Sequence, residues 1–106
     1  MDIKRNDNNR KISDTLTFGG VALNLSGATV KFLMRSIPGA SVEVTIKDDA
    51  VIEDEAAGTV YYELGSDQTA VAGKYYFEWE VTFGDGSVTT FPSTGYGQLT
   101  IVEDLG

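Results

Sequence analysis

Two glutamates on one stretch of the chain best fit acid–base chemistry by type and spacing. Glu78 and Glu80 stand two positions apart, and on one face of a strand this spacing separates the carboxylates by roughly 7 Å. Paired carboxylates at such a distance are the machinery of glycosidases. Nothing in the surrounding residues supplies a cleft or the apolar environment that tunes a catalytic acid. We therefore interpret the pair as part of a solvated sheet face, with the glycosidase interpretation as the less favoured alternative.

Cysteine and histidine are both absent from the 106 residues. Zinc fingers, iron–sulfur sites, disulfide frameworks, thiolate nucleophiles and Ser-His-Asp triads each need one of these residue types. Because no other catalytic constellation stands out, we expect no enzymatic activity and no cofactor.

Carboxylates are dense where Asp48 and Asp49 are followed by Glu53, Asp54 and Glu55. Calcium prefers such oxygen ligands in flexible loops. The spacing matches no EF-hand loop, and the glycine that such a loop requires is missing. We expect an acidic hairpin loop here, with a bound cation as the less favoured alternative.

The element that carries Glu78 and Glu80 is the clearest strand in the sequence. In Lys74–Phe83, KYYFEWEVTF, apolar and polar side chains alternate strictly over ten residues. This alternation predicts a strand with one face in a core and one face in water. Gly84-Asp85-Gly86 then predicts a tight hairpin turn, with Ser87–Phe91 as the returning strand.

The same alternation recurs along the rest of the chain, with turn residues at regular intervals. Strand patterns with one apolar parity end at Met34, Ile46, Leu64 and Ile101, and the first of the series places Ile12, Leu16 and Phe18 on one side, interrupted by Asp14. Residues 66–72 are the best candidate for a single helical turn, with Asp67 as its N-cap. These patterns predict an all-β protein, a single antiparallel sandwich of about seven to nine short strands.

Two aromatic residues have predicted structural roles. Trp79, in the middle of the longest strand, is the expected core anchor, with Phe18, Phe32, Phe77 and Phe83 among its apolar neighbours. The run from Asp67 to Tyr75 looks like the crossing between two strands of an immunoglobulin-type sandwich, in which a tyrosine hydroxyl returns to the backbone a few residues upstream. We expect Tyr75 to form such a tyrosine corner.

Charge divides the chain unevenly. Residues 1–47 carry 7 basic and 4 acidic side chains, a balance of +3, whereas residues 48–106 carry 1 basic and 12 acidic side chains, a balance of −11, and the two add to the net charge of −8. The negative net charge argues against a nucleic-acid partner, since phosphate binding needs Lys and Arg concentrated on one face. The basic N-terminal part also argues against an acidic mimic of DNA. We interpret the acidic surplus first as a solvated surface. The alternative is that the asymmetry steers docking on a basic partner or on other copies of the chain, and beside the sandwich pattern it looks like an assembly feature.

The first ten residues are polar and contain no apolar core of a signal peptide, and no stretch approaches the ~20 apolar residues of a membrane helix. We therefore expect residues 1–10 to be a mobile polar arm and residues 11–106 to form the immunoglobulin-like β-sandwich, with no membrane partner. The candidate partner contacts are the basic residues of the arm and its boundary and three exposed tyrosines: Lys4, Arg5, Arg10, Lys11, Tyr61, Tyr76 and Tyr96.

Several of these segments together resemble a known family. LNLSGATVKFLMRS at residues 23–36, the Gly58-Thr59-Val60-Tyr61 strand and the run from Ala72 to Pro92 are similar to the N-terminal domain of phage baseplate upper proteins and to related immunoglobulin-like modules of phage tails. The resemblance extends over residues 10–104. It implies attachment of other modules to the tail by protein–protein contact, in copies repeated by virion symmetry. Family members usually continue into a helical or fibre segment, whereas this sequence stops at Gly106.

The function that we expect on this basis is that of a non-enzymatic virion structural protein of a phage tail, baseplate, neck or decoration. Its partners would be other virion proteins, and it would be made in the host cytoplasm and located in the virion. The alternative is a carbohydrate-binding or adhesin-type immunoglobulin-like module that uses the exposed tyrosines.

Overall fold

The computed structural model describes residues 2–6, 10–39, 45–92 and 97–103. Over these residues the protein is all-β and contains no helix. The strands are β1 (Asp2–Lys4), β2 (Arg10–Thr15), β3 (Thr17–Phe18), β4 (Val21–Ala22), β5 (Thr29–Ser36), β6 (Thr45–Asp49), β7 (Val51–Asp54), β8 (Thr59–Leu64), β9 (Gly73–Thr82), β10 (Val88–Phe91) and β11 (Gly97–Val102).

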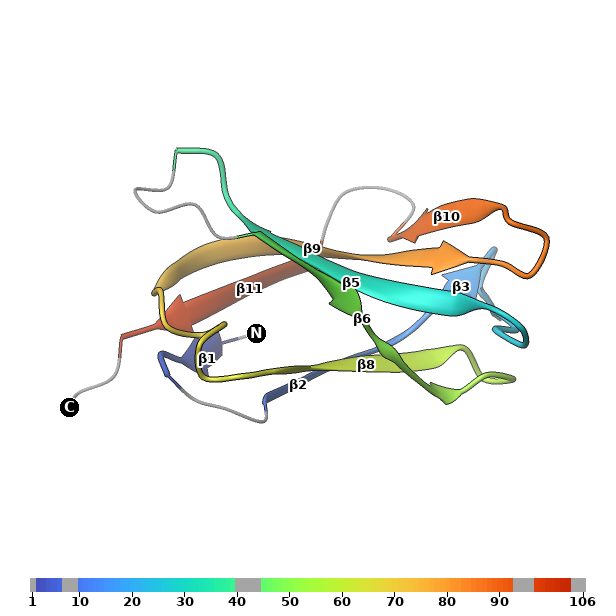
Figure 1. Ribbon diagram of the computed structural model, residues 1–106, viewed down its shortest axis with the longest axis horizontal. Helices are drawn as coiled ribbons and strands as arrows, with labels where there is room; N and C mark the ends of the chain where they lie inside the picture. The colour runs from blue at the N-terminus through green and yellow to red at the C-terminus, as the bar shows by residue number, and fades with distance from the viewer. Residues whose placement is uncertain (1, 7–9, 40–44, 93–96, 104–106) are drawn as a thin grey trace.

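The strands form two facing sheets and one separate hairpin (Figure 1). The larger sheet has the order β1-β11-β9-β5-β6, with β10 also paired to β9. The smaller sheet has the order β2-β8-β7, and β3 and β4 pair only with each other. The pairs within the sheets are antiparallel except for β1 and β11, which run parallel.

The ten-residue strand β9 organises the larger sheet. One of its edges pairs with β5 along its length, from Thr29↔Thr82 to Ser36↔Tyr75. The other edge is shared, because β10 pairs with residues 79–82 and β11 pairs with residues 73–77. β10 and β11 therefore lie end to end along the same edge.

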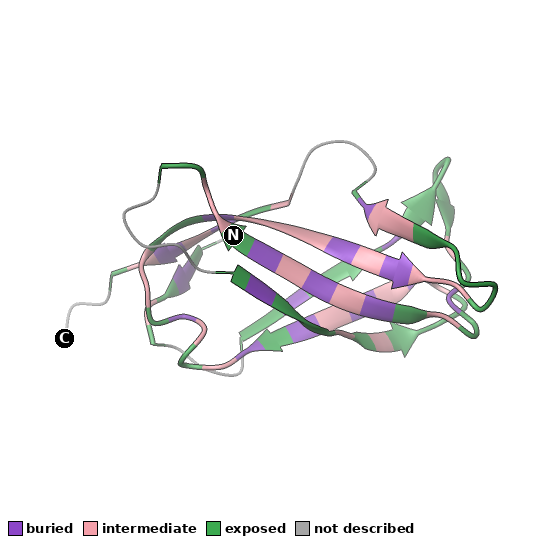
Figure 2. Ribbon diagram, turned by 45° about the horizontal axis from the view of Figure 1, so that its top comes forward, coloured by how far each residue is buried: buried purple, intermediate pink, exposed green. Residues whose placement is uncertain are grey.

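The core lies between the two sheets, and alternation places its side chains there as the sequence predicts. Buried and more exposed residues alternate along β5 and β9 (Figure 2). Trp79 is 0% exposed, and the Phe32 ring stacks on Tyr62 of the facing sheet at 4.6 Å between centroids. The buried hydrophobic side chains are Ile3, Ile12, Leu16, Leu25, Val30, Phe32, Met34, Ile46, Val60, Tyr62, Leu64, Tyr75, Trp79, Val81, Phe91, Leu99 and Ile101.

Hydrogen bonds from aromatic side chains connect the elements around this core. The Trp79 indole Nε1–H donates to Asp14 Oδ2 on the facing sheet at 3.1 Å. The Tyr62 hydroxyl donates to Asp48 Oδ2 at 3.1 Å and accepts from Gln68 Nε2 at 2.7 Å. The hydrogen bond predicted for Tyr75 is confirmed, because its hydroxyl donates to the Val71 carbonyl at 2.5 Å, and burial raises the pKa of Tyr75.

Two predictions about the strands are wrong. The sheets are mixed and not purely antiparallel, and the described residues form eleven strands where seven to nine were expected. The parallel pair comes from the N-terminus, because residues 2–4 form β1 on the larger sheet and are not a free arm; the short strands β3 and β4 also add to the count. Ile3 is the physical reason, since it is the one strongly apolar side chain of this segment and is 2% exposed beside Ile101.

Two further predictions differ in detail. Phe18 was expected in the core but is 71% exposed, because the chain leaves the sheet after Leu16 and enters the separate β3–β4 hairpin. Within residues 66–72 only 66–69 form a hydrogen-bonded turn, which is not part of a helix, and in it the Gly65 carbonyl accepts from the backbone N–H groups of Gln68 and Thr69. The predicted strand positions Val42 and Val44 lie outside the described residues.

Replacement of Ile3 tests whether β1 belongs to the fold. We expect Ile3→Ala to lower the free energy of unfolding by about 2–5 kcal/mol, because it removes buried methyl groups and leaves a cavity. Lys4→Ala, at an exposed neighbouring position, should change it by less than about 0.5 kcal/mol. Urea unfolding followed by Trp79 fluorescence measures both. Equal effects of the two substitutions would contradict the assignment of β1.

Replacement of Asp14 tests the bond to Trp79. Asp14→Ala should lower the free energy of unfolding by about 1–3 kcal/mol, since it leaves a buried N–H without its acceptor. Asp14→Asn keeps an oxygen acceptor and should lose clearly less. If both variants unfold at the wild-type urea concentration, Asp14 does not contribute through this bond.

Candidate interaction surfaces

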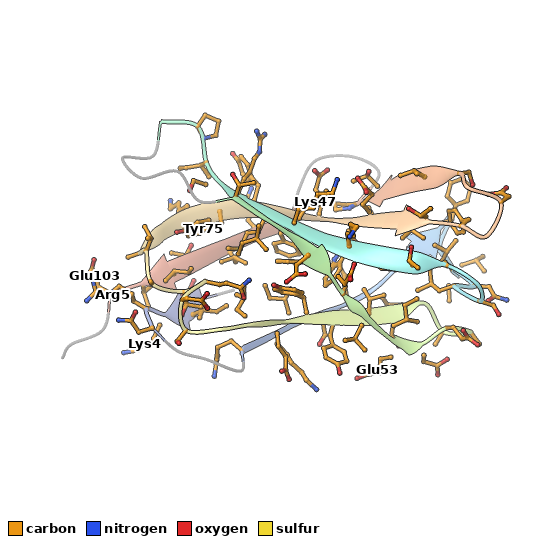
Figure 3. All side chains as sticks on the ribbon, in the orientation of Figure 1. Lys4, Arg5, Lys47, Glu53, Tyr75 and Glu103 are labelled. Atoms are coloured by element: carbon orange, nitrogen blue, oxygen red, sulfur yellow. The ribbon has the colours of Figure 1, made fainter. Side chains whose placement is uncertain are left out.

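Lys4 and Arg5 lie at one end of the molecule, where β1 and β11 terminate (Figure 3). The Arg5 backbone N–H donates to the Val102 carbonyl at 2.7 Å, which extends the parallel ladder by one step. Arg5 Nη1 lies 3.5 Å from Glu103 Oε2. Lys4 is the last residue of β1, and its side chain is exposed. We call this end, with residues 2–6, 65–72 and 102–103, the terminal end.

Arg10 and Lys11 begin β2, which is an edge strand of the smaller sheet. Lys11 Nζ lies 4.4 Å from the centroid of the Tyr61 ring, a cation–π arrangement on the outer face of that sheet. Val51, which is 46% exposed, pairs opposite Tyr61 on β7. The structure therefore brings two of the predicted contact residues, Lys11 and Tyr61, together.

Tyr76 lies on the larger sheet, on the outer side of β9. Its neighbours in the register are Arg35 on β5 and Gln98 on β11. Tyr96, the third predicted tyrosine, lies outside the described residues. The described contact residues are thus distributed over the terminal end and the outer faces of both sheets, and they do not form one site.

Ion pairs cross the outer face of the larger sheet. Lys31 Nζ lies 2.9 Å from Asp49 Oδ1, and the hydrogen bond and charge of that carboxylate raise the pKa of Lys31. Lys47 Nζ lies 3.8 Å from Glu80 Oε1. Glu80 therefore faces a lysine of β6, as expected for a charged sheet face, and Glu78 pairs opposite Leu33.

A shallow hollow, which we call the Tyr76 hollow, lies on this outer face across β5, β6 and β9. Its surface is largely apolar, and its lining includes Leu33, Ile46 and Tyr76 with the basic residues Arg35 and Lys47 and the carboxylate Glu78. Apolar surface bordered by charged groups is the usual anatomy of a protein contact site. The hollow thus includes one predicted contact residue, Tyr76.

Carboxylates of the acidic segment 48–55 stabilise loops and contacts between strands. Asp48 accepts the hydroxyl of Tyr62, and Asp49 meets Lys31. Asp54 Oδ1 accepts the backbone N–H groups of Ala56 and Ala57, both at 3.1 Å. Within the described part of the chain, no three carboxylates gather in a group that could hold a metal ion.

The end opposite the termini carries apolar side chains whose exposure the sequence patterns did not predict. We call it the loop end; it consists of residues 16–28, 54–58 and 83–88. Phe18 and Val21 pair across the β3–β4 hairpin and are 71% and 69% exposed, and Val88 is 56% exposed. Gly19-Gly20 between Phe18 and Val21 was the available signal, because two glycines between apolar residues are typical of a tight hairpin.

Backbone hydrogen bonds hold the base of the loop end together. The N–H groups of Leu16, Leu23 and Leu25 donate to the carbonyls of Gly58, Leu16 and Glu55, at 2.8, 2.9 and 2.8 Å. Gly58 has a φ of +70°, and a Cβ there would lie 2.7 Å from the Leu16 and Leu23 carbonyl oxygens. The hairpin therefore stands on a closely packed, ordered base.

The loop end is also acidic. Its three segments contain Asp54, Glu55 and Asp85 and no lysine or arginine. Asp85 Oδ1 accepts the Ser87 hydroxyl at 2.6 Å and the Ser87 backbone N–H at 2.9 Å, which lowers the pKa of Asp85. The rest of the molecule is mixed in charge, because the terminal end carries Asp2, Asp67 and Glu103 beside Lys4 and Arg5, and two lysines of the larger sheet meet carboxylates.

Tyr62 offers a pH-dependent test of the polar contacts. Burial and then Asp48 raise its pKa, partly offset by the hydrogen bond from Gln68. A raised pKa in the folded state means that its contribution to stability is full below the unfolded value of about 10 and is lost as pH rises through the folded value.

We expect Tyr62→Phe to lower the free energy of unfolding by about 1–2 kcal/mol at neutral pH, because Asp48 and Gln68 lose a partner. The variant should also lose less stability than the wild type between pH 9 and about 11. Tyr75 titrates in the same range, so a reduced alkaline loss is expected and not its disappearance. Urea unfolding at each pH measures this, and an unchanged alkaline loss would contradict it.

None of the described segments forms a helix with the length and apolar character that crossing a bilayer requires. In sequence, neither a protein-family model nor a curated protein matches this chain.

Proposed function

We propose that the two sheets form an immunoglobulin-like sandwich. The order β11-β9-β5-β6 corresponds to the strands G, F, C and C′ of the variable type, and β2-β8-β7 corresponds to B, E and D. The hydrogen bond from Tyr75 at the start of β9 to Val71 has the geometry of the tyrosine corner on strand F. The chain departs from antibody domains in lacking the cysteine pair and in placing its buried tryptophan on β9.

We further propose that the protein is a non-enzymatic structural component of a phage virion, which docks on other virion proteins through protein–protein contacts. The observation that carries this proposal is the β3–β4 hairpin, where Phe18 and Val21 are paired and about 70% exposed. Contiguous exposed apolar side chains on an ordered support are typical of protein contact sites. The resemblance to phage tail modules supplies the virion context.

The polar side chains support the same interpretation. Asp14, Asp48, Asp49 and Asp54 each accept a hydrogen bond or meet a lysine within the chain. These carboxylates therefore stabilise the folded chain, as is expected of carboxylates in a module that functions by assembly. In a virion the module would occur in several symmetric copies, after synthesis in the host cytoplasm.

The carbohydrate-binding alternative relies on exposed tyrosine rings. Tyr61 and Tyr76 lie on different sheets, and one face of the Tyr61 ring is covered by the Lys11 ammonium group at 4.4 Å. A sugar stacking on that face would have to displace the lysine. The geometry therefore favours the assembly function over the adhesin function.

The test is incorporation into particles of the phage that encodes the chain. Removal of residues 1–10 is unsuitable, since it deletes β1 and the buried Ile3. We expect the wild type in purified particles, and Phe18→Ser/Val21→Ser to be folded but at least about 10-fold depleted, since hot-spot apolar contacts are worth that much or more. Mass spectrometry of particles measures the depletion.

Val51→Ser is the matched control, because it removes an exposed apolar side chain on the smaller sheet. It should incorporate at the wild-type level. Absence of the wild type from particles would contradict the proposed function, and normal incorporation of the hairpin variant would contradict the role of the hairpin. Saturable binding on a glycan array, lost in Tyr61→Ala or Tyr76→Ala, would favour the alternative.

A further inference from the structure

The N-terminal strand β1 is held in place by few contacts. It is the last strand in the order of the larger sheet and pairs with β11 at three positions. Ile3, buried beside Ile101, is the only member of the buried hydrophobic set that lies on β1. Detachment of β1 would therefore leave most of the core in place and expose the edge of β11. An exposed strand edge readily pairs with a strand of another chain.

The connection after β1 contains a strained residue. Asn6 has a φ of +66°, and it is the one residue other than glycine with a positive φ among those that the structure describes. This left-handed conformation carries a cost for any residue with a side chain that an extended backbone does not carry. Asn6 lies between β1 and β2, which belong to different sheets. Extension of the chain at Asn6 would relieve the strain and carry β1 away from its own β11.

The contacts of β1 can all be made by β1 of a second copy, because the two chains are identical. They are the pairing with β11 and the burial of Ile3. The Arg5 N–H also donates to the Val102 carbonyl at 2.7 Å. The Asn6 N–H donates to the Thr69 carbonyl at 3.0 Å, and rotation about the N–Cα bond of Asn6 leaves this N–H group with β1. Exchange therefore keeps these contacts and gains the relief at Asn6.

The length of the connection determines which ends of the two copies meet. Lys4 and Arg10 are six residue steps apart, which span at most about 20 Å when fully extended. Because β2 begins at Arg10, β1 can reach only a copy whose terminal end lies beside its own.

The charges allow two terminal ends to meet. This end carries both signs, whereas the loop end is acidic without any basic residue. Like charges brought together oppose association, and opposite charges favour it. Two terminal ends can therefore approach each other more readily than two loop ends. The charged side chains of the terminal end are Asp2, Lys4, Arg5, Asp67 and Glu103.

We propose that the protein dimerises by exchange of β1, so that residues 2–4 of each copy pair with β11 of the other. The contact is isologous, since each copy gives and receives the same strand. Exchange of an identical element is a low-cost route to a dimer, because it reuses contacts that the fold already makes. The inference goes beyond the proposed function and does not depend on it. Exchange uses the terminal end and leaves the Phe18–Val21 hairpin of each copy free.

Cysteines introduced into separate copies test the exchange directly, because the native chain has none. Asp2 and Thr100 pair across β1 and β11. The Asp2→Cys and Thr100→Cys proteins are mixed, unfolded together in urea, refolded at millimolar concentration and oxidised. We expect a disulfide-linked heterodimer, in which peptide mapping assigns the link to positions 2 and 100. Absence of this link would overturn the proposal.

Two controls accompany the cross-link. The double variant Asp2→Cys/Thr100→Cys, at micromolar concentration, should form the link within one chain, which shows that the pair can be bridged; Lys4 and Val102 provide a second pair. Asp2→Cys mixed with Glu53→Cys should give no specific heterodimer, because Glu53 lies away from the terminal end (Figure 3). Equal yields of links to positions 53 and 100 would mean random oxidation and would count against exchange.

Substitutions at Asn6 test the hinge. Asn6→Gly removes the cost of the positive φ from the closed monomer and should weaken dimerisation by about 5-fold or more. Asn6→Val raises that cost, since a β-branched residue is an outlier in this region, and should strengthen dimerisation by about 10-fold or more. Sedimentation velocity of the full chain, from micromolar to millimolar concentrations, measures the dimerisation constant. A wild type that is monomeric throughout, or equal constants for the three proteins, would contradict the proposal.

Ile3 distinguishes exchange from a contact between two closed monomers. It is buried in the closed monomer and equally in the exchanged dimer, so Ile3→Val should leave the dimerisation constant within about 2-fold of the wild type. Detachment of β1 precedes exchange, so the variant should exchange subunits about 3-fold or more faster, because a smaller buried side chain holds β1 less tightly. Native mass spectrometry of mixed, isotopically distinct dimers measures this rate. An unchanged rate would indicate a surface contact and not exchange.

These results are separable from failure of the proposed function. If the wild type enters particles but no link forms between positions 2 and 100 of different copies, exchange is wrong and the assembly function stands. If the link forms but the chain is absent from particles, exchange stands and the virion function is wrong.

Discussion

The indole of Trp79 imposes the constraint on which the arrangement of the two sheets depends. This side chain is 0% exposed, and its N–H must find an acceptor inside the fold because an unmet buried donor costs about 1–3 kcal/mol. Asp14 of the facing sheet supplies it at 3.1 Å. The bond places β2 against β9, and the stacked rings of Phe32 and Tyr62 add a second contact between the sheets.

From this constraint follows the division of the molecule into a packed middle and two different ends. Leu16, two residues after Asp14, is the last residue of the series held in the core, and the chain beyond it is free to form a separate hairpin. The loops around Gly58 then support that hairpin through backbone bonds. The apolar surface at the loop end thus stands on segments that backbone hydrogen bonds connect next to the buried Leu16 and Leu25.

The sequence patterns predict the β class, the inward parity of β5, β8 and β9, the turn before β10 and the hydrogen bond of Tyr75 to the upstream backbone, because these depend on local alternation or on residues few positions apart. The position of β1 could not be predicted, since Ile3 is its only strongly apolar side chain and its partner strand lies almost 100 residues away. Asp14 looked like an interruption because its acceptor role depends on Trp79. Phe18 kept the apolar parity, but parity cannot show where a chain leaves its sheet.

The parallel pairing of β1 with β11 has a mechanical consequence. If tension is applied to the chain before Asp2 and after Val102, the two strands are drawn past each other along their length. The rungs from Asp2↔Thr100 to Lys4↔Val102 are then loaded together in shear, where an antiparallel hairpin pulled from its open end would yield one rung at a time. The three residue pairs of this parallel ladder and the buried Ile3 thus hold β1 and β11 together under load. The domain therefore resists extension along the line joining its two ends.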